Sequence, residues 1–207
     1  MTTAINICCP HREAGYPHIL MKVSNEQAAA NRERILNEAT RLFREYGFAK
    51  VGVDTLTQAA GLTHGSLYSH FGSKDALMAQ ALSHGRSQTA RTPPGIKTIA
   101  DAVSVYLSAA HRDNPGGGCY MAALGCDMPR QSKEVRKVFT EIVRTRVKQV
   151  AALLPKRRNR DREDQALAII ATMVGAITLA RAVDDLEFSE RIMEVSRARI
   201  LQKNQKT

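Results

Sequence analysis

The chain has 207 residues, a formal net charge of +10 and four cysteines, and 43% of its residues are hydrophobic. This length is enough for one large domain or two small ones with a buried core. No run of apolar residues approaches the roughly 18 that a membrane-spanning helix needs, and residues 1–10 lack the basic start and apolar stretch of a secretory signal. We therefore expect a cytoplasmic protein that does not enter a membrane, with its cysteines reduced.

The positive charge is unevenly distributed along the chain. Lys22 to Ala90 carries 8 basic against 6 acidic residues, whereas the chain from Arg91 onward carries 21 against 13. A surplus of positive charge favours a polyanionic partner such as nucleic acid. Most of this surplus is consistent with a solvated surface, so net charge alone does not identify the partner.

The first 20 residues show no helical or strand period. We interpret residues 1–21 as a disordered tail or a non-native start extension, because Met21 opens a segment that reads as a natural start. A metal site formed by Cys8, Cys9, His11 and His18 is the alternative. Adjacent cysteines do not have the usual spacing of zinc ligands, so we expect no metal and no cofactor.

From Asn25 onward, apolar residues repeat at helical spacing until Gly47, which is expected to end a first helix. This helix would form the back of a small module. Arg32 and Arg34, with Lys22 in the preceding arm, are either phosphate contacts or solvated charges.

The stretch from Val53 to Asp75 predicts two short helices joined by a tight turn, followed by the start of a third helix. Asp54 or Thr55 can cap the first short helix, and Gly61 suits the left-handed turn. Thr63 or His64 opens the second helix, and Ser73 is an N-cap signal for the third. The hydroxyl of Thr57 faces the interior and must bond a backbone carbonyl one turn earlier.

A helix of seven or eight residues does not persist alone in water, so it must be packed on its neighbours. The outer face of the second helix is small, polar and uncharged, which suits a helix lying in the major groove of DNA. The predicted DNA-binding residues on this face are Thr63, His64, Ser66, Tyr68, Ser69 and His70, and Lys74 at the N-terminus of the next helix is placed to contact a phosphate. His70 either contacts DNA or packs beneath the helix.

The run GLTHGSLYSHFGSKDAL, beginning at Gly61, resembles the DNA-binding signature of the tetracycline-repressor (TetR) family of transcriptional regulators. The segment MVGAITLARAVDD, beginning at Met173, resembles the C-terminal region of a TetR subfamily more weakly. The resemblance implies an all-α protein in which a helix-turn-helix domain precedes a ligand-binding and dimerisation domain. By the family pattern, Gly65 also lies in the groove and Thr55 stands at a helix start that faces the DNA backbone. The resemblance further implies a repressor that a small-molecule effector releases from a palindromic DNA operator. The sequence does not distinguish a repressor of transcription from an activator.

The break Thr92-Pro93-Pro94-Gly95 separates the two expected domains, residues 22–91 and 96–207. Beyond it, helical periodicity predicts helices over 96–111, 119–126, 132–154 and 164–184, and a last helix that Ser189 can cap. No strand-like alternation is present, and the whole chain is expected to contain about nine helices.

The last two helices are the expected homodimer surface, because two from each subunit would form a four-helix bundle. The predicted interface residues are Leu167, Ile170, Val174, Gly175, Ile177, Ile192 and Val195. The alternative is that these residues face the subunit's own core. The candidate residues for lining an effector cavity are Tyr106, Met121, Leu124, Met128, Phe139, Val143 and Met173.

Cys119 and Cys126 are seven residues apart and would share a helix face. The alternative to effector binding is a redox or electrophile sensor at Cys119, with Arg112 or Arg130 stabilising a thiolate. A buried inert cysteine is the competing interpretation. The chain has no paired catalytic carboxylates, no His-x-x-x-His, no GxSxG motif and no phosphate-binding glycine loop, so we do not expect an enzyme.

Overall fold

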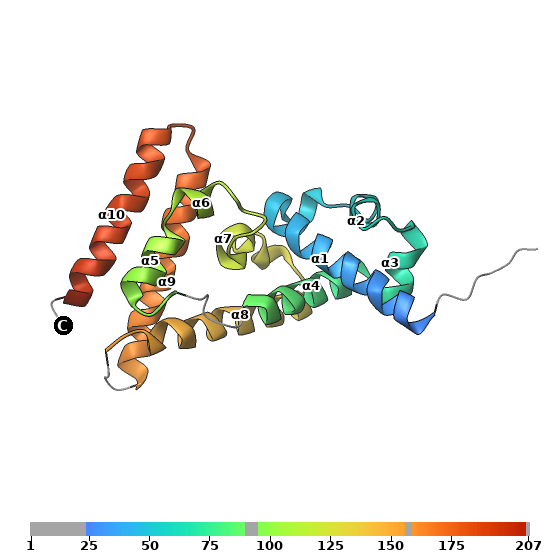
Figure 1. The fold of residues 1–207 in the computed structure, drawn as a ribbon, viewed down its shortest axis with the longest axis horizontal. Helices are drawn as coiled ribbons and strands as arrows, with labels where there is room; N and C mark the ends of the chain where they lie inside the picture. The colour runs from blue at the N-terminus through green and yellow to red at the C-terminus, as the bar shows by residue number, and fades with distance from the viewer. Residues whose placement is uncertain (1–23, 90–94, 156–158, 206–207) are drawn as a thin grey trace, which may run out of the picture.

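The computed structural model describes residues 24–89, 95–155 and 159–205, and these residues form ten α-helices and one 3-10 helix, with no strand among them (Figure 1). The all-α prediction is confirmed. The helices are α1 (Asn25–Lys50), α2 (Val53–Ala59), α3 (His64–Phe71), α4 (Lys74–Thr89), α5 (Ile99–Tyr106), α6 (Ala109–Arg112), α7 (Tyr120–Leu124), η1 (Met128–Arg130), α8 (Lys133–Ala152), α9 (Asn159–Ala182) and α10 (Leu186–Gln205).

Helix α1 begins at a serine cap and bends at a glycine near its end. The side chain of Ser24 accepts a hydrogen bond from the backbone N–H of Gln27. Gly47 has a φ of 78° inside the helix, a conformation that glycine adopts cheaply, and the regular helical path breaks there. The predicted end at Gly47 is three residues early, because α1 continues to Lys50. The buried face of α1, which includes Ile35, Ala39 and Phe43, then packs against α4.

The turn between α2 and α3 has the predicted geometry. Gly61 has a φ of 65°, and the hydroxyl of Thr57 donates to the carbonyl of Val53 at 3.1 Å, one turn earlier. The predicted cap of α2 is wrong: α2 begins at Val53, its N-cap residue is Gly52, and no side chain caps it. Asp54 and Thr55 therefore lie inside the first turn of α2.

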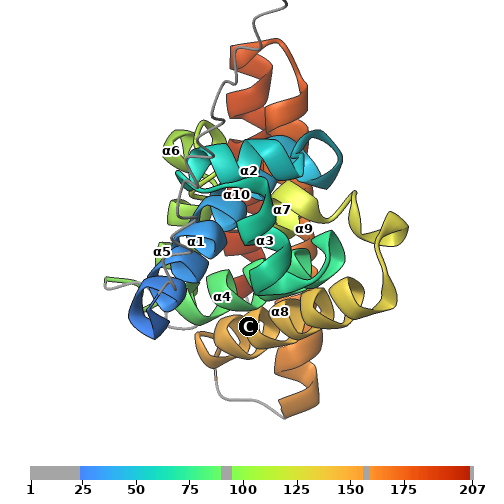
Figure 2. The ribbon, with the colours of Figure 1, turned by 90° about the vertical axis from the view of Figure 1, so that its right-hand side faces the viewer.

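Helix α4 connects the N-terminal helices to the rest of the molecule. Its first turn is capped by Ser73, whose Oγ accepts from the N–H of Ala76 at 3.1 Å. α4 packs against α1 on one side and α8 on the other (Figure 2). The core around α1–α4 extends to Tyr120, Leu124 and Met128, so one set of buried side chains joins the two predicted domains.

The predicted helix over 96–111 is two helices. At Leu107 the backbone leaves the helical conformation, with a φ of −94° and a ψ of 57°. The side chain of Ser108 then caps α6 by accepting from the N–H of His111. Apolar periodicity continues through the break because Leu107 is fully buried, and for this reason the sequence pattern did not show it.

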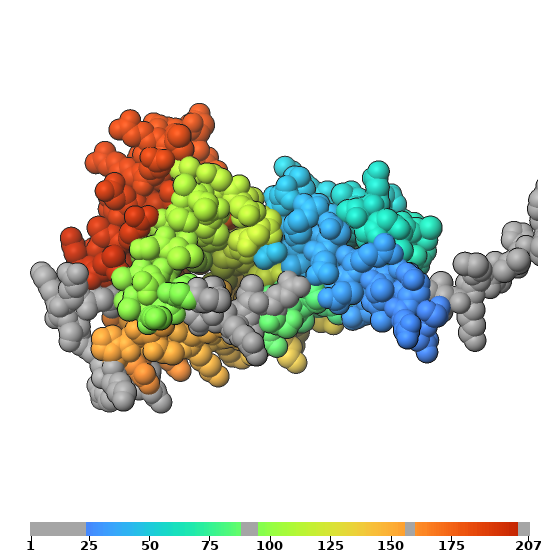
Figure 3. Space-filling view, viewed as in Figure 1, coloured from blue at the N-terminus to red at the C-terminus, as the bar shows by residue number. Residues whose placement is uncertain are grey.

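Helices α9 and α10 pack side by side at the end of the molecule farthest from α3 (Figures 1 and 3). α9 begins at Asn159, five residues before the predicted start. The predicted cap of α10 is wrong: Asp185 accepts from the N–H of Phe188, whereas Ser189 is buried and donates to the carbonyl of Ala180. Ser189 thus ties α10 to the end of α9.

The segment Arg160–Ala182 of α9 is long and apolar enough, by composition, to cross a membrane. Counting consecutive apolar residues did not indicate this, because polar residues interrupt the run. The evidence for a membrane span is weak, since the core helix of a soluble protein meets the same requirement.

Candidate nucleic-acid interface and effector cavity

Helix α3 lies at one end of the molecule (Figure 1), and its outward side is polar. The side chains of Thr63, His64, Tyr68 and Ser69 are exposed, as is Gly65, whereas Ser66 and His70 are half-buried. Three of the hydroxyls make local hydrogen bonds: Thr63 Oγ1 lies 3.1 Å from Ser66 Oγ, and Ser69 Oγ donates to the carbonyl of Ser66.

The inner side of α3 holds the helix in place. Leu67 is fully buried and Phe71 is 6% exposed, in the core that α1 and α4 also form. The guanidinium of Arg32 lies 5.3 Å from the centroid of the Phe71 ring and donates to Gln80 of α4. Arg32 therefore links α1 to both α3 and α4. Together with α2, these helices hold α3 in place although it has only eight residues.

Lys74 contacts the end of α1. Its Nζ donates to the carbonyl of Phe48 at 3.1 Å, and the N–H of the same Phe48 faces the carboxylate of Asp127 at 3.4 Å. An ammonium group has three donors, so this bond leaves two for a phosphate. Thr55 is exposed on the first turn of α2.

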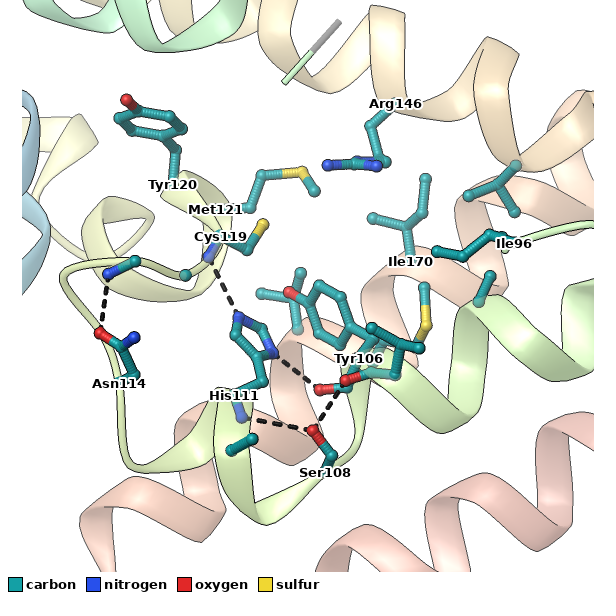
Figure 4. Close-up of a pocket in the computed structure, with 18 of the residues that line it drawn as sticks. Ile96, Tyr106, Ser108, His111, Asn114, Cys119, Tyr120, Met121, Arg146 and Ile170 are labelled. Carbon is teal, nitrogen blue, oxygen red and sulfur yellow. Dashed lines mark hydrogen bonds between the residues drawn. The ribbon is translucent and has the colours of Figure 1, made fainter. Parts of the chain in front are cut away.

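A cavity of about 640 Å³ lies between α5, α7, α8 and α9 (Figure 4). This volume is in the range of small-molecule sites. Of the seven predicted lining residues, Tyr106, Met121 and Met173 line it, while Leu124, Met128, Phe139 and Val143 do not. Leu124 and Met128 instead pack in the core against α1 and α4. Apolar periodicity predicts that a residue is buried, but it does not predict whether that residue lines a cavity or packs in a core.

His111 joins two walls of this cavity. Its Nδ1 lies 2.7 Å from the carbonyl oxygen of Tyr106, and its Nε2 accepts the backbone N–H of Cys119 at 3.1 Å (Figure 4). These two bonds fix the neutral tautomer with the proton on Nδ1. Burial, more than the nearby Arg181 and Arg146, lowers the pKa of His111.

The cavity wall also contacts the N-terminal module. Arg44 of α1 donates to the carbonyl of Gly118 at 3.0 Å, and its guanidinium lies 4.6 Å from the centroid of the Tyr120 ring. Gly118 and Tyr120 both line the cavity. Sequence reasoning did not identify His111, Arg44 or Arg146, because lone basic residues in amphipathic helices carry no local signal.

Cys119 lines the cavity and is half-buried, whereas Cys126 is exposed and is not among the lining residues; both are free thiols. The two arginines proposed to stabilise a thiolate are already paired: Arg112 with Asp113 at 2.7 Å and Arg130 with Asp127 at 3.0 Å. That part of the redox interpretation loses its support.

The predicted dimer residues divide between the surface and the core. Leu167 and Val195 are exposed, Val174, Gly175 and Ile192 are half-buried, and Ile170 and Ile177 are buried in the chain's own core. Ile170 and Ile177 therefore cannot form a surface contact, because α9 turns them toward its neighbours. Further large apolar side chains are exposed on α9 and α10: Leu179, Leu186 and Phe188.

Within the described residues no three His, Cys, Asp or Glu side chains are arranged to hold a metal. The alternative metal site at Cys8, Cys9, His11 and His18 lies outside the described residues, as do Lys22 and the predicted tail.

These features define a helix-turn-helix module joined to an all-α domain that encloses a cavity. Residues 35–81 match the family model "Bacterial regulatory proteins, tetR family". The N-terminal region of the chain is therefore similar to this family, over residues 35–81.

Two relatives and one solved structure extend the comparison. The chain is 48% identical over 56 residues to the HTH-type transcriptional repressor Rv1474c of Mycobacterium tuberculosis, covering 27% of this chain and 30% of that protein. It is 30% identical over 120 residues to the HTH-type transcriptional repressor DhaR of Mycobacterium sp. (strain GP1), covering 55% and 58%. A TetR transcriptional regulator from Legionella pneumophila superposes with a TM-score of 0.70 at 19% identity, covering 89% of this chain and all of that one.

These matches differ in what they establish. The chain spans about a third of the length of the first relative and somewhat more than half of the second. The family model covers residues 35–81, and the structural likeness shows the fold over 89% of the chain.

Proposed function

We propose that this protein is a sequence-specific DNA-binding transcriptional regulator, and that it acts as a repressor. The observation that carries the proposal is the exposed polar face of α3, a helix of eight residues that packs on α2 and α4 and contacts α1 through Arg32. Small uncharged side chains on such a helix can approach base edges in the major groove. The repressors to which the chain is similar support the same assignment.

The DNA contacts divide into two groups. Tyr68 and Lys74, with Thr55, are placed for phosphates, and Thr63, His64, Ser66 and Ser69 for base edges, with His70 at the margin. Nε2 of His64 lies 3.6 Å from the carboxylate of Asp54, so a negatively charged group lies beside the polar face of α3. Gly65 has nothing within 4 Å of the position of an added Cβ, so its use is close approach to DNA rather than internal packing.

A homodimer would present two copies of α3 to a palindromic operator. The support for this is the group of exposed apolar side chains on α9 and α10, at the end of the molecule away from α3. Large apolar side chains that are exposed on two neighbouring helices are consistent with a protein–protein contact there. We place the protein in the cytoplasm with its DNA, and not in a membrane.

An effector in the 640 Å³ cavity would release the DNA. Arg44 and Tyr120 connect the cavity wall to α1 and α4, so a ligand that moves α7 would also move the helices that support α3. The effector binds more tightly to the conformation in which the two α3 helices do not match the operator, so it increases the fraction of protein in that conformation.

A sensor acting through Cys119 is the second candidate. The observation that favours it is that this free thiol lines the cavity next to Tyr106. The backbone N–H of the same cysteine donates to His111. Treatment with peroxide or an aldehyde would release the wild-type protein from DNA and leave Cys119→Ser bound. Identical behaviour of both proteins would exclude this candidate.

Gel-shift titration with the DNA flanking the protein's own gene tests the proposal. We expect a salt-sensitive, sequence-selective complex at nanomolar to sub-micromolar protein. Tyr68→Ala should weaken it, whereas Tyr46→Ala, an exposed tyrosine on α1, should not. The absence of a selective complex at any salt concentration would contradict the proposal.

A further inference from the structure

The charges around the cavity indicate what kind of molecule it binds. The residues that line it include no aspartate or glutamate, but they include Arg146 of α8. In the part of the chain that the structure describes, Arg146 has neither an ion pair nor a hydrogen bond, and Figure 4 shows its guanidinium directed into the cavity. An arginine remains charged at any physiological pH, so its charge there is uncompensated.

The other polar groups at the cavity are donors or are already used. Tyr106 Oη is buried and has no hydrogen-bond partner among the described residues. Burial, together with the neighbouring Cys119, raises the pKa of Tyr106, so the hydroxyl keeps its proton. The one free acceptor of neutral His111 is occupied by the N–H of Cys119. The cavity therefore offers donors that lack acceptors.

A second guanidinium, that of Arg181, lies next to the part of the cavity wall formed by Gly118 and adds positive potential there. Arg181 donates to the carbonyls of His111 and Arg112, and its Nη1 is buried without a partner in the described structure. Its Nη2 lies 3.2 Å from the position of a Cβ added at Gly118, a residue that lines the cavity. Buried donors and charges of this kind are costly unless an acceptor pairs with them.

Most of the remaining lining is aliphatic or sulfur-containing, including Ile96, Val105, Met121, Val150, Ile170 and Met173. We propose that the cavity binds an apolar monocarboxylate, with its carboxylate between Arg146 and the Tyr106 hydroxyl and its aliphatic or aromatic body against α5 and α9. A carboxylate supplies two acceptor oxygens for the guanidinium and the phenol and neutralises the charge. This inference rests on the proposed function, since it names the chemical class of the effector.

Binding calorimetry with the purified full-length protein, without DNA, tests the inference. The probes are decanoate, 1-decanol and decylammonium, which share a chain length and differ in the head group, and 4-phenylbutyrate as an aromatic acid. We expect one acid bound per chain, with decanoate at least tenfold tighter than decanol and with no binding of decylammonium. Equal affinity for decanoate and decanol, or no binding of either acid, would overturn the proposal.

Arg146→Met tests the residue that carries the inference. It should weaken decanoate by tenfold or more and leave decanol within a factor of two, and Arg146→Lys should retain part of the preference. Arg144→Met is the matched control, because it removes the same charge from the same helix at a side chain that is 68% exposed. If Arg146→Met kept the full preference for decanoate over decanol, the proposal would be overturned. The same result in Arg146→Lys would agree with the proposal, because lysine keeps the positive charge.

Gel shifts with the same acids separate this inference from the proposed function. An acid that binds but does not release DNA would leave the carboxylate assignment standing and contradict the effector mechanism. A protein that binds DNA selectively but binds no acid would contradict the carboxylate assignment alone.

Discussion

The ring of Tyr120 occupies the space where a side chain at Gly85 would lie. A Cβ added to Gly85 on α4 would come within 1.4 Å of Tyr120 Oη and 2.3 Å of its Cζ. Tyr120 begins α7 and lines the cavity, while α4 packs directly on α1. The absence of a side chain at one position thus brings the cavity wall into contact with the helix that leads to the DNA-binding module.

Gly85→Ala should destabilise the protein by about 1–3 kcal/mol, because the buried tyrosine ring must move to admit the methyl group. In a Tyr120→Ala background the same change should cost nothing or stabilise, since alanine is the better helix former. Urea unfolding of the four proteins measures the coupling. Equal destabilisation in both backgrounds would mean that the ring is not the obstacle.

Gly65→Ala should separate stability from DNA binding. Nothing lies within 4 Å of the added Cβ, so the substitution should stabilise α3 by up to about 1 kcal/mol. On DNA, the methyl group would hinder close approach and reduce operator affinity. Thermal unfolding and gel shifts on one preparation give both values, and an unchanged or higher DNA affinity would remove Gly65 from the interface.

Val195→Glu should convert a dimer into monomers, because a charge would enter the apolar surface of α9 and α10, where Val195 is 60% exposed. Leu167→Glu should act in the same direction. Tyr46→Glu, at an exposed aromatic residue on α1, is the control. Light scattering after size-exclusion chromatography reports the mass, and a wild-type monomer at micromolar concentration would contradict the dimer proposal.

His111 should make the C-terminal helices acid-sensitive. Burial lowers the pKa of His111 in the folded protein below its ordinary value of 6.5, so the unfolded chain binds the proton first as pH falls. Its contribution to stability is therefore complete well above pH 6.5 and is lost as pH falls from there toward the folded pKa. The groups that face it are Tyr106, Cys119, Arg146 and Arg181.

Unfolding free energies at pH 7.5 and 5.5 measure this effect. Wild type should lose more stability over that interval than His111→Gln, which cannot titrate. Ser87 is exposed and outside the cavity, so Ser87→Ala is a control that should follow wild type. A His111→Gln variant with the same pH dependence as wild type would show that other groups are responsible.

The sequence predicted the helix-turn-helix well because its signals are local. Gly61 requires a left-handed turn, Ser73 caps the next turn, and Leu67 and Phe71 mark a buried stripe, so each can be interpreted without knowing the rest of the fold. The same reasoning failed at Asp54, Thr55 and Ser189, where a capping residue type is present but the helix begins elsewhere. Residue type alone does not fix where a helix starts.

The cavity was less predictable because its lining depends on long-range packing. Leu124 and Tyr106 are alike in periodicity, yet one fills the core beneath α1 and the other faces the cavity. Ile170 and Ile177 belong to the apolar pattern of α9 together with Leu167, and only the placement of neighbouring helices decides which are buried. Arg146 and His111 gave no local signal, since their significance comes from groups that are far away in sequence.

Footprinting with hydroxyl radicals on the DNA beside the protein's own gene tests the central claim most directly. The account predicts two protected segments related by a dyad and separated by roughly one helical turn or slightly more, about 34 Å or above, with Tyr68→Ala weakening both equally. A single protected segment without symmetry, or protection that Tyr68→Ala leaves unchanged, would contradict a symmetric reader that acts through α3.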